Sequence, residues 1–305
     1  MRKLTYAIAL STLLLAGCSQ EDGIMESKGE LVTLNYKVSL GKDVQSRAGA
    51  SDLAVNKLLC VVFENGAEIK RDIVNVENGQ ATYTPQLFTS IEYNIVFWAY
   101  YDNTPDDETV NSCFDMTSAT AIAANTSYGG EDFTEDKHKD AYTNVHTVIL
   151  SQQGQTPSVI LTRPFAQVNI ISSMADYNKA VSYGRTPTTC KVEISGYANQ
   201  FNALTGEWTG IGSTTLTSTV VAGDEDCLYA SEYVFGNGTA TSCKVTVYDN
   251  DVNGPKPIYS ADVPSLPLGE NQRTNLTSEN LLTGGGVTYT ITVGEGFHGE
   301  NNNVI

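Results

Sequence analysis

Strict alternation of apolar and polar residues marks the first strand of the chain, over residues 32–40. Its apolar face consists of Val32, Leu34, Tyr36, Val38 and Leu40. Because successive side chains of a strand point to opposite faces, this pattern predicts a strand with one buried face. Residues 41–51 follow without any period and contain several small residues, so we expect an exposed loop around Arg47.

Two Asn-Gly pairs divide the next apolar segments. Apolar runs cover residues 58–63, 67–76 and 80–83, and the pairs Asn65-Gly66 and Asn78-Gly79 lie between them. Asn-Gly between alternating runs is a strong signal for a two-residue turn, because both residues readily adopt a positive φ. The segment therefore predicts consecutive antiparallel hairpins.

The remaining strand patterns in this half of the chain complete a first β-domain. Residues 93–100 are apolar on both faces, which is typical of a central sandwich strand. Residues 101–142 are acidic and lack periodicity, so we expect a long loop or an irregular insertion. Apolar runs at 145–150 and 159–161 are the last strands before the predicted boundary, which gives a first domain of residues 31–162.

The rest of the chain, residues 163–305, predicts a second β-domain. Its strand patterns lie at residues 165–170, 191–196, 244–248 and 258–263. One short helix is expected at residues 175–182. Many short strands separated by turns favour Greek-key sandwiches over a parallel α/β fold. We therefore predict an all-β protein of two tandem Greek-key-type β-sandwich domains with little helix.

The last strand pattern follows a run of three glycines, Gly284 to Gly286. Its apolar face consists of Val287, Tyr289, Ile291 and Val293, with threonines between them. Because consecutive glycines form a flexible hinge, we expect residues 287–293 to be able to leave the body of their own subunit.

The N-terminus predicts export and lipidation. Arg2 and Lys3 precede a short apolar segment that ends in Leu-Ala-Gly-Cys at residues 15–18. This arrangement is similar to a bacterial lipobox, so we expect residues 1–17 to be a signal peptide and Cys18 to be acylated. Several acyl chains on one residue would anchor the chain stably in a membrane. Residues 18–30 are polar and acidic and are expected to form a tether.

Charge and composition exclude several classes of protein. The chain has 35 acidic and 18 basic residues and a formal net charge of −17, which argues against binding to nucleic acid. No apolar run approaches the roughly 20 residues of a bilayer-spanning helix. The cysteines other than Cys18 are sparse, lie within apolar runs and are expected to be core residues: Cys60, Cys113, Cys190, Cys227 and Cys243.

The sequence contains no recognisable catalytic motif, so we expect neither an enzyme nor a cofactor or resident metal. His138 lies in a charged run at residues 135–140, which we expect to be solvated. An acidic cluster (Asp102, Asp106, Asp107 and Glu108) lacks EF-hand spacing and is expected to be a plain loop. Trp98 lies in a strand expected to be buried, which leaves Trp208 as the better candidate for stacking on a sugar.

The two ends of the chain are complementary. Cleavage after Arg47 would free the strand at 32–40 and leave an apolar groove with open edges, and such edges recruit strands. The terminal strand of a neighbouring copy would fill this groove. Because that contact is heterologous and does not close, it would build a filament.

Several short motifs carry a resemblance to a known family. They are the lipobox, the strand followed by Arg47, Leu-Thr-Arg-Pro-Phe-Ala-Gln-Val-Asn-Ile at residues 161–170, Gln-Arg-Thr-Asn-Leu at 272–276, Asn-Leu-Leu-Thr at 280–283 and Gly-Phe-His-Gly at 296–299. Over essentially the whole chain, these motifs resemble the fimbrillin family of type V pili.

The resemblance implies a pilus subunit with two transthyretin-like β-sandwich domains that serves adhesion at the cell surface. It implies that Cys18 carries palmitate in the outer membrane and that an Arg-specific protease cuts between Arg47 and Ala48. Strand 32–40 would then be displaced and replaced by a donor strand, residues 287–293, of another subunit. The partners would be other pilus subunits and a host surface protein or glycan.

Two alternatives remain open at this point. A glycan-binding surface lipoprotein would use Trp208, and a tip or anchor subunit of the pilus would not be cleaved.

Overall fold

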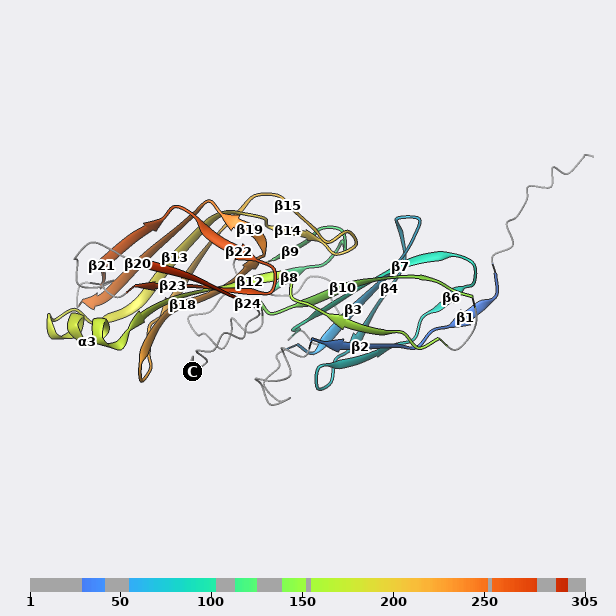
Figure 1. The fold of residues 1–305 in the computed structure, drawn as a ribbon, viewed down its shortest axis with the longest axis horizontal. Helices are drawn as coiled ribbons and strands as arrows, with labels where there is room; N and C mark the ends of the chain where they lie inside the picture. Colours follow the sequence, from blue (N-terminus) through green and yellow to red (C-terminus); the bar gives the residue numbers. More distant parts are fainter. Residues whose placement is uncertain are drawn as a thin grey trace, which may run out of the picture.

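The computed structural model describes residues 29–41, 55–102, 113–124, 139–151, 155–251, 254–278 and 289–295. These residues form an elongated, nearly all-β molecule with its N-terminal strands at one end and helix α3 at the other (Figure 1). The prediction of an all-β sandwich fold is confirmed. Within the described residues, no helix is long and apolar enough to cross a membrane.

The N-terminal strands form two facing layers. One layer is an antiparallel sheet in the order β10 (Tyr142–Ile149), β7 (Glu92–Tyr100), β3 (Lys57–Glu64) and β4 (Ala67–Asn75). The other contains a sheet in the order β11 (Ser158–Leu161), β2 (Tyr36–Leu40) and β5 (Gln80–Tyr83), and the pair β1 (Leu31–Thr33) with β6 (Gln86–Phe88). Alternate apolar residues of both layers are buried in one core between them.

Both Asn-Gly pairs form the turns that the sequence predicts. Asn65 and Gly66 have φ values of 49° and 78°, and they join β3 to β4 with Glu64 directly opposite Ala67. Asn78 and Gly79 have φ values of 51° and 72° between the bridged residues Glu77 and Gln80. Positive φ at both central residues gives a turn whose twist matches that of the flanking strands.

The C-terminal strands form a second pair of layers. The first sheet has the order β17 (Val221–Ala222), β18 (Asp226–Phe235), β12 (Phe165–Ser173), β23 (Gln272–Ser278) and β24 (Tyr289–Glu295). The second has the order β16 (Gly212–Thr219), β13 (Pro187–Tyr197), β20 (Ser242–Asp251) and β21 (Gly254–Val263), and β19 (Asn237–Ala240) pairs with β22 (Leu266–Gly269).

The predicted short helix is confirmed as α3 (Met174–Ser182). It begins at Ser173, whose side chain accepts a hydrogen bond from the Asp176 backbone amide at 3.2 Å. A serine in this position satisfies one of the amides left free at a helix start.

A smaller sheet joins the two halves of the chain, and the sequence did not predict it. Its order is β15 (Glu207–Thr209), β14 (Gln200–Asn202), β9 (Ile122–Ala124) and β8 (Phe114–Asp115). The expectation of a loop throughout 101–142 is therefore wrong for 113–124. In the larger sheets, the strands up to β11 pair with one another and the strands from β12 onward pair with one another. The smaller sheet contains strands of both halves, so the domain bounds 31–162 and 163–305 stay a prediction.

An aromatic cluster packs where the halves meet. Trp98 from β7 lies 5.5 Å from Phe114, 6.2 Å from Phe165 and 6.0 Å from Phe201, measured between ring centroids. Phe165 stacks in turn on Phe235 at 4.7 Å. Rings at these separations stabilise the contact beyond the area they bury. Strand β7 thus contributes to two cores, because its other face points into the N-terminal sandwich.

Buried ion pairs cross the same junction. Lys139 Nζ lies 2.7 Å from Glu232 Oε1, and the two residues are 8% and 3% exposed. Arg163 makes two hydrogen bonds of 2.7 and 2.8 Å to the Asp140 carboxylate and lies over the Tyr142 ring. The expectation of a solvated charged run is therefore wrong for Lys139 and Asp140, because strand β18 and the β11–β12 connection supply opposite charges.

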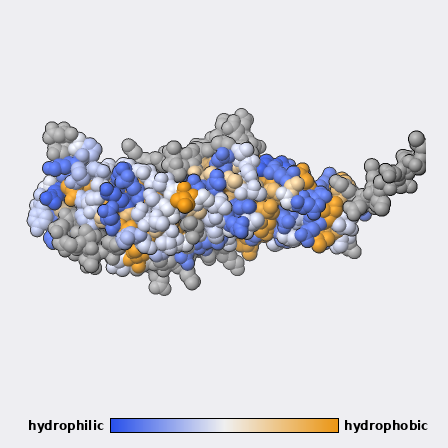
Figure 2. Space-filling model, turned by 90° about the horizontal axis from the view of Figure 1, so that it is seen from above, coloured by the Kyte–Doolittle hydropathy of each residue, from blue (hydrophilic) through white to orange (hydrophobic). Residues whose placement is uncertain are grey.

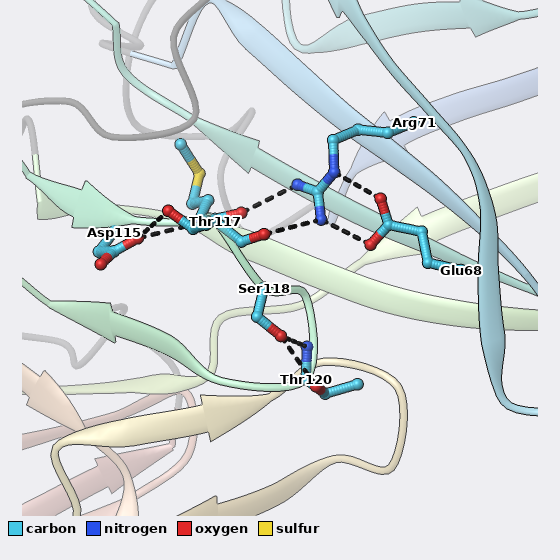
Figure 3. Close-up of polar contacts among 7 residues, drawn as sticks. Glu68, Arg71, Asp115, Thr117, Ser118 and Thr120 are labelled. Carbon is cyan, nitrogen blue, oxygen red and sulfur yellow. Dashed lines mark hydrogen bonds and ion pairs between the residues drawn. The ribbon is translucent and has the colours of Figure 1, made fainter.

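The Arg71 side chain links the edge strand β4 to the turn between β8 and β9 by hydrogen bonds (Figure 3). Its guanidinium donates to both oxygens of Glu68 at 2.7 Å and to the backbone oxygens of Met116 and Thr117 at 2.9 and 3.3 Å. Beyond this turn, the Ala203 amide donates to the Ala119 carbonyl at 3.0 Å. A continuous set of hydrogen bonds therefore runs from β4 through the turn to the C-terminal half.

The surface carries its apolar residues in several small patches on the face shown in Figure 2. Among the described residues, the large apolar side chains that are exposed are Leu31, Ile69, Ile149, Ile160, Val181, Tyr183 and Ile211. The five cysteines expected in the core are buried there. Single exposed apolar residues are normal on a folded protein.

We predict that the Lys139–Glu232 pair makes the junction sensitive to loss of one partner. Glu232→Ala should lower the free energy of unfolding by about 3–5 kcal/mol, because it leaves a buried ammonium without its counter-ion. The double change Lys139→Met with Glu232→Leu should recover most of that loss. Urea unfolding followed by circular dichroism measures both.

The matched control is the exposed pair Lys191–Glu193, whose charged atoms lie 2.9 Å apart. Glu193→Ala should change the free energy of unfolding by no more than about 1 kcal/mol. Equal losses for Glu232→Ala and Glu193→Ala would contradict the prediction.

Candidate functional site

The first strand segment lies inside the N-terminal sandwich. The alternate residues that the sequence predicts to face inward are all at most 3% exposed: Val32, Leu34, Tyr36, Val38 and Leu40. The polar residues between them face outward or lie at the surface. Fully burying one aliphatic or aromatic side chain contributes about 1.5–3 kcal/mol, so this face holds the segment firmly.

Strand β2 lies between two neighbours. It pairs in antiparallel register with β5, where Tyr36 faces Tyr83, and in parallel register with β11, where Lys37 faces Ser158. Connecting residues add bonds on both sides, among them Leu40 N to Gly79 O at 3.0 Å and Lys37 N to Pro157 O at 2.9 Å. Removal of β2 would therefore leave two open strand edges with an apolar slot between them.

Tyr36 lies among aromatic rings beneath this segment. Its ring lies 5.3 Å from Phe97, 5.5 Å from His146 and 6.4 Å from Tyr83, measured between centroids. Its hydroxyl is hydrogen-bonded to His146 Nδ1 at 3.1 Å. Burial lowers the pKa of His146 and raises the pKa of Tyr36, so both groups are neutral at pH 7.

The outward face of β2 lies at the bottom of a shallow polar hollow of about 760 Å³. Its walls include Lys37, Ser39, Gln80 and Thr82, with the turn at 77–78 beside them. The segment thus presents a polar surface on one side and fills the core on the other.

The terminal strand pattern forms β24, at the edge of a C-terminal sheet. Among the described residues it pairs only with β23, with Ile291 opposite Leu276. Ile291 is half-buried against the C-terminal core, whereas Thr290 is exposed. The expected strand therefore exists, and in this structure it is paired within its own chain.

Several candidate residues lie outside the described part of the chain. They are the lipidation site Cys18, the cleavage-site residues Arg47 and Ala48, and Val287 at the start of the donor segment. His138, His298, Asp106, Asp107 and Glu108 lie outside it too. Tyr289 and Val293 are described as members of strand β24.

The other chemical candidates do not form a site in the described residues. Asp102 is 4% exposed and its backbone is hydrogen-bonded to the Asn56 side chain at 2.8 Å. Groups of three or more residues able to hold a metal ion do not occur within the described ranges. Trp98 is buried as predicted, and Trp208 packs against Phe201 at 5.6 Å. Trp208 is thus a partly buried member of the aromatic cluster at the junction of the halves.

Residues 26–305 match the model of a protein family that is described as a family of unknown function, DUF6562. The chain belongs to this family. No curated protein matches the sequence.

The fold of this DUF6562 protein is similar to that of solved surface proteins. A “putative cell adhesion protein” from Bacteroides ovatus is 14% identical, with a TM-score of 0.53 over 88% of this chain and 98% of the other. The tip fimbrial protein Mfa3 from Porphyromonas gingivalis, with a C-terminal truncation, is 13% identical, with a TM-score of 0.50 over 87% of this chain and 100% of the other.

A third similar structure is described as “putative polysaccharide binding proteins (DUF1812)” from Bacteroides thetaiotaomicron. It is 12% identical, with a TM-score of 0.50 over 87% of this chain and 98% of the other. At these identities the likeness shows a common fold.

We predict that Tyr36 and its neighbour Lys37 differ sharply in their effect on stability. Tyr36→Ala should lower the free energy of unfolding by about 3–5 kcal/mol, because it leaves a cavity between Phe97, Tyr83 and His146. Lys37→Ala, on the outward face, should stay within about 0.5 kcal/mol. Chemical denaturation of the two variants tests this difference, and similar losses would argue against the inward orientation of Tyr36.

Proposed function

We propose that this DUF6562 protein is a structural subunit of a cell-surface pilus, exported as a lipoprotein acylated at Cys18. An Arg-specific protease cuts between Arg47 and Ala48, strand 32–40 leaves, and the terminal strand 287–293 of another copy replaces it. The domain bounds 31–162 and 163–305 are part of this proposal.

The observation that carries the proposal is the central position of β2. A strand at the edge of a sheet leaves one open edge when it is removed, but β2 leaves the edges of both β5 and β11. Five side-chain positions in the N-terminal core would empty at the same time. Unpaired main-chain groups and exposed apolar surface are both costly, so a cut chain needs a replacement strand.

The position of β24 supports its role as the replacement. In its own sheet it has one neighbour, β23, and Ile291 is only half-buried. In the slot it would have two neighbours and an apolar face enclosed on the core side. Transfer from the first position to the second therefore gains a row of hydrogen bonds and buried apolar area.

Location and partners follow from this assembly. The lipid on Cys18 anchors the subunit at the outer membrane, and the subunit's partners are other pilus subunits and a host surface protein or glycan. The fold likeness to adhesion and fimbrial proteins supports a non-enzymatic role at the cell surface. A tip or anchor position is the alternative, and Trp208 offers little to a purely sugar-binding role because its ring packs on Phe201.

We predict that limited trypsin digestion of residues 19–305 cuts once, after Arg47, and gives Ala48 as the new N-terminus. A ladder of oligomers should then appear, because each cut copy both opens a slot and carries a donor strand. N-terminal sequencing and native mass spectrometry measure the two steps. A single cut that leaves only monomers would contradict strand exchange between copies of this chain. Resistance at Arg47 would contradict the proposed processing and favour an uncleaved tip or anchor subunit.

We also predict that Ile291→Asp abolishes oligomer formation, because it places a carboxylate in the apolar slot. The monomer should stay folded, since Ile291 lies on an edge strand and is only half-buried. Thr290→Asp is the matched control, because Thr290 is exposed and belongs to the opposite face. Native electrophoresis after digestion compares the variants, and filaments from Ile291→Asp subunits would refute the donor assignment.

A further inference from the structure

Tyr36 is the one residue on the buried face of the first strand with a polar side-chain atom. The other four positions are Val32, Leu34, Val38 and Leu40. Its hydroxyl meets His146 Nδ1 at 3.1 Å, and its ring is enclosed by aromatic residues of β5 and β7 and by His146 of β10. This pocket therefore suits a residue that combines an aromatic ring with a terminal hydroxyl.

Apolar alternation alone does not set the register of an incoming strand. A shift by one residue turns the apolar face outward and is excluded, but a shift by two residues keeps every apolar side chain on the buried face. A single distinctive position removes this ambiguity, as one polar residue fixes the register of a coiled coil. The Tyr36 pocket is such a position, because an aliphatic residue placed there leaves a void and an unpaired His146 nitrogen.

The terminal segment contains one tyrosine on its apolar face. Val287 and Ile291 lie two positions before and after Tyr289, as Leu34 and Val38 do for Tyr36. If Tyr289 takes the place of Tyr36, Val287 and Ile291 therefore occupy the sites of Leu34 and Val38 whichever way the strand runs. Shifting the segment by two residues instead forces the Tyr289 ring into a site built for valine or leucine. An oversized side chain in a packed core costs stability.

We propose that Tyr289 of a second copy occupies the pocket vacated by Tyr36, bonds to His146, and thereby sets the register of strand exchange. This inference rests on the proposed function and adds a specificity-determining contact to it. His146 would then serve both states of the protein: it holds Tyr36 before cleavage and Tyr289 of a neighbouring copy after it.

The test measures capture of a labelled synthetic peptide of residues 285–295 by the full chain after trypsin cleavage. Tyr289→Phe in the peptide should weaken capture about fivefold, because the half-buried His146 loses its hydrogen-bond partner. His146→Leu in the chain should weaken capture of the unchanged peptide by a similar factor. Combining the two changes should restore capture to within about threefold of the original, since neither group then lacks a partner.

Two control peptides separate this inference from the proposed function. Thr290→Val removes a hydroxyl from the opposite face and should leave capture unchanged. Ile291→Asp should abolish capture whatever fixes the register. The Tyr289→Phe peptide meets an unaltered chain, so its result does not depend on the folding of a variant.

The outcomes are distinct. Equal capture of the original and Tyr289→Phe peptides, or independent effects of Tyr289→Phe and His146→Leu, would overturn the Tyr289 assignment while strand exchange stands. Absence of capture of the original peptide would overturn strand exchange itself, and the register contact with it. Restored capture when Tyr289→Phe is combined with His146→Leu supports both strand exchange and the Tyr289 assignment.

Discussion

The N-terminal half depends on the burial of one face of residues 32–40, whose strand β2 lies between the edges of β5 and β11. This segment closes one layer of the sandwich and fills the core that the opposite sheet presents. Because its hydrogen bonds run to both sides, the segment cannot be lost without opening both neighbours. The same features make the segment essential to this half of the fold, and under the proposed processing they would favour its replacement.

The junction between the halves is built differently. Here an aromatic cluster around Trp98 is combined with the buried Lys139–Glu232 pair and with the hydrogen bonds of Arg71. Aromatic packing buries apolar surface, whereas paired charges require a specific arrangement because either charge alone is costly in the interior. The junction is therefore specific as well as stable, and it fixes how the two halves of this elongated molecule meet.

Much of the local structure could be predicted because a few neighbouring residues encode it. The alternation at 32–40 gave the inward face correctly, and the two Asn-Gly pairs gave the turns around β4. The short helix also follows from a local signal, since Ser173 caps it. The prediction missed the strands in the acidic region at 101–142, because β8 and β9 have only two and three residues and are too short to show an apolar–polar alternation.

The sequence by itself determined which residues of the first strand face inward, because side chains alternate along any extended chain. Only the tertiary structure decided that β2 lies between β5 and β11, since the parallel partner comes more than a hundred residues later. It also decided that Lys139 is buried, that Trp208 packs on Phe201, and that Tyr36 meets His146. The contacts of Lys139 with Glu232 and of Tyr36 with His146 join residues far apart in the chain, so they depend on the packing of whole sheets and leave no signal in the local pattern.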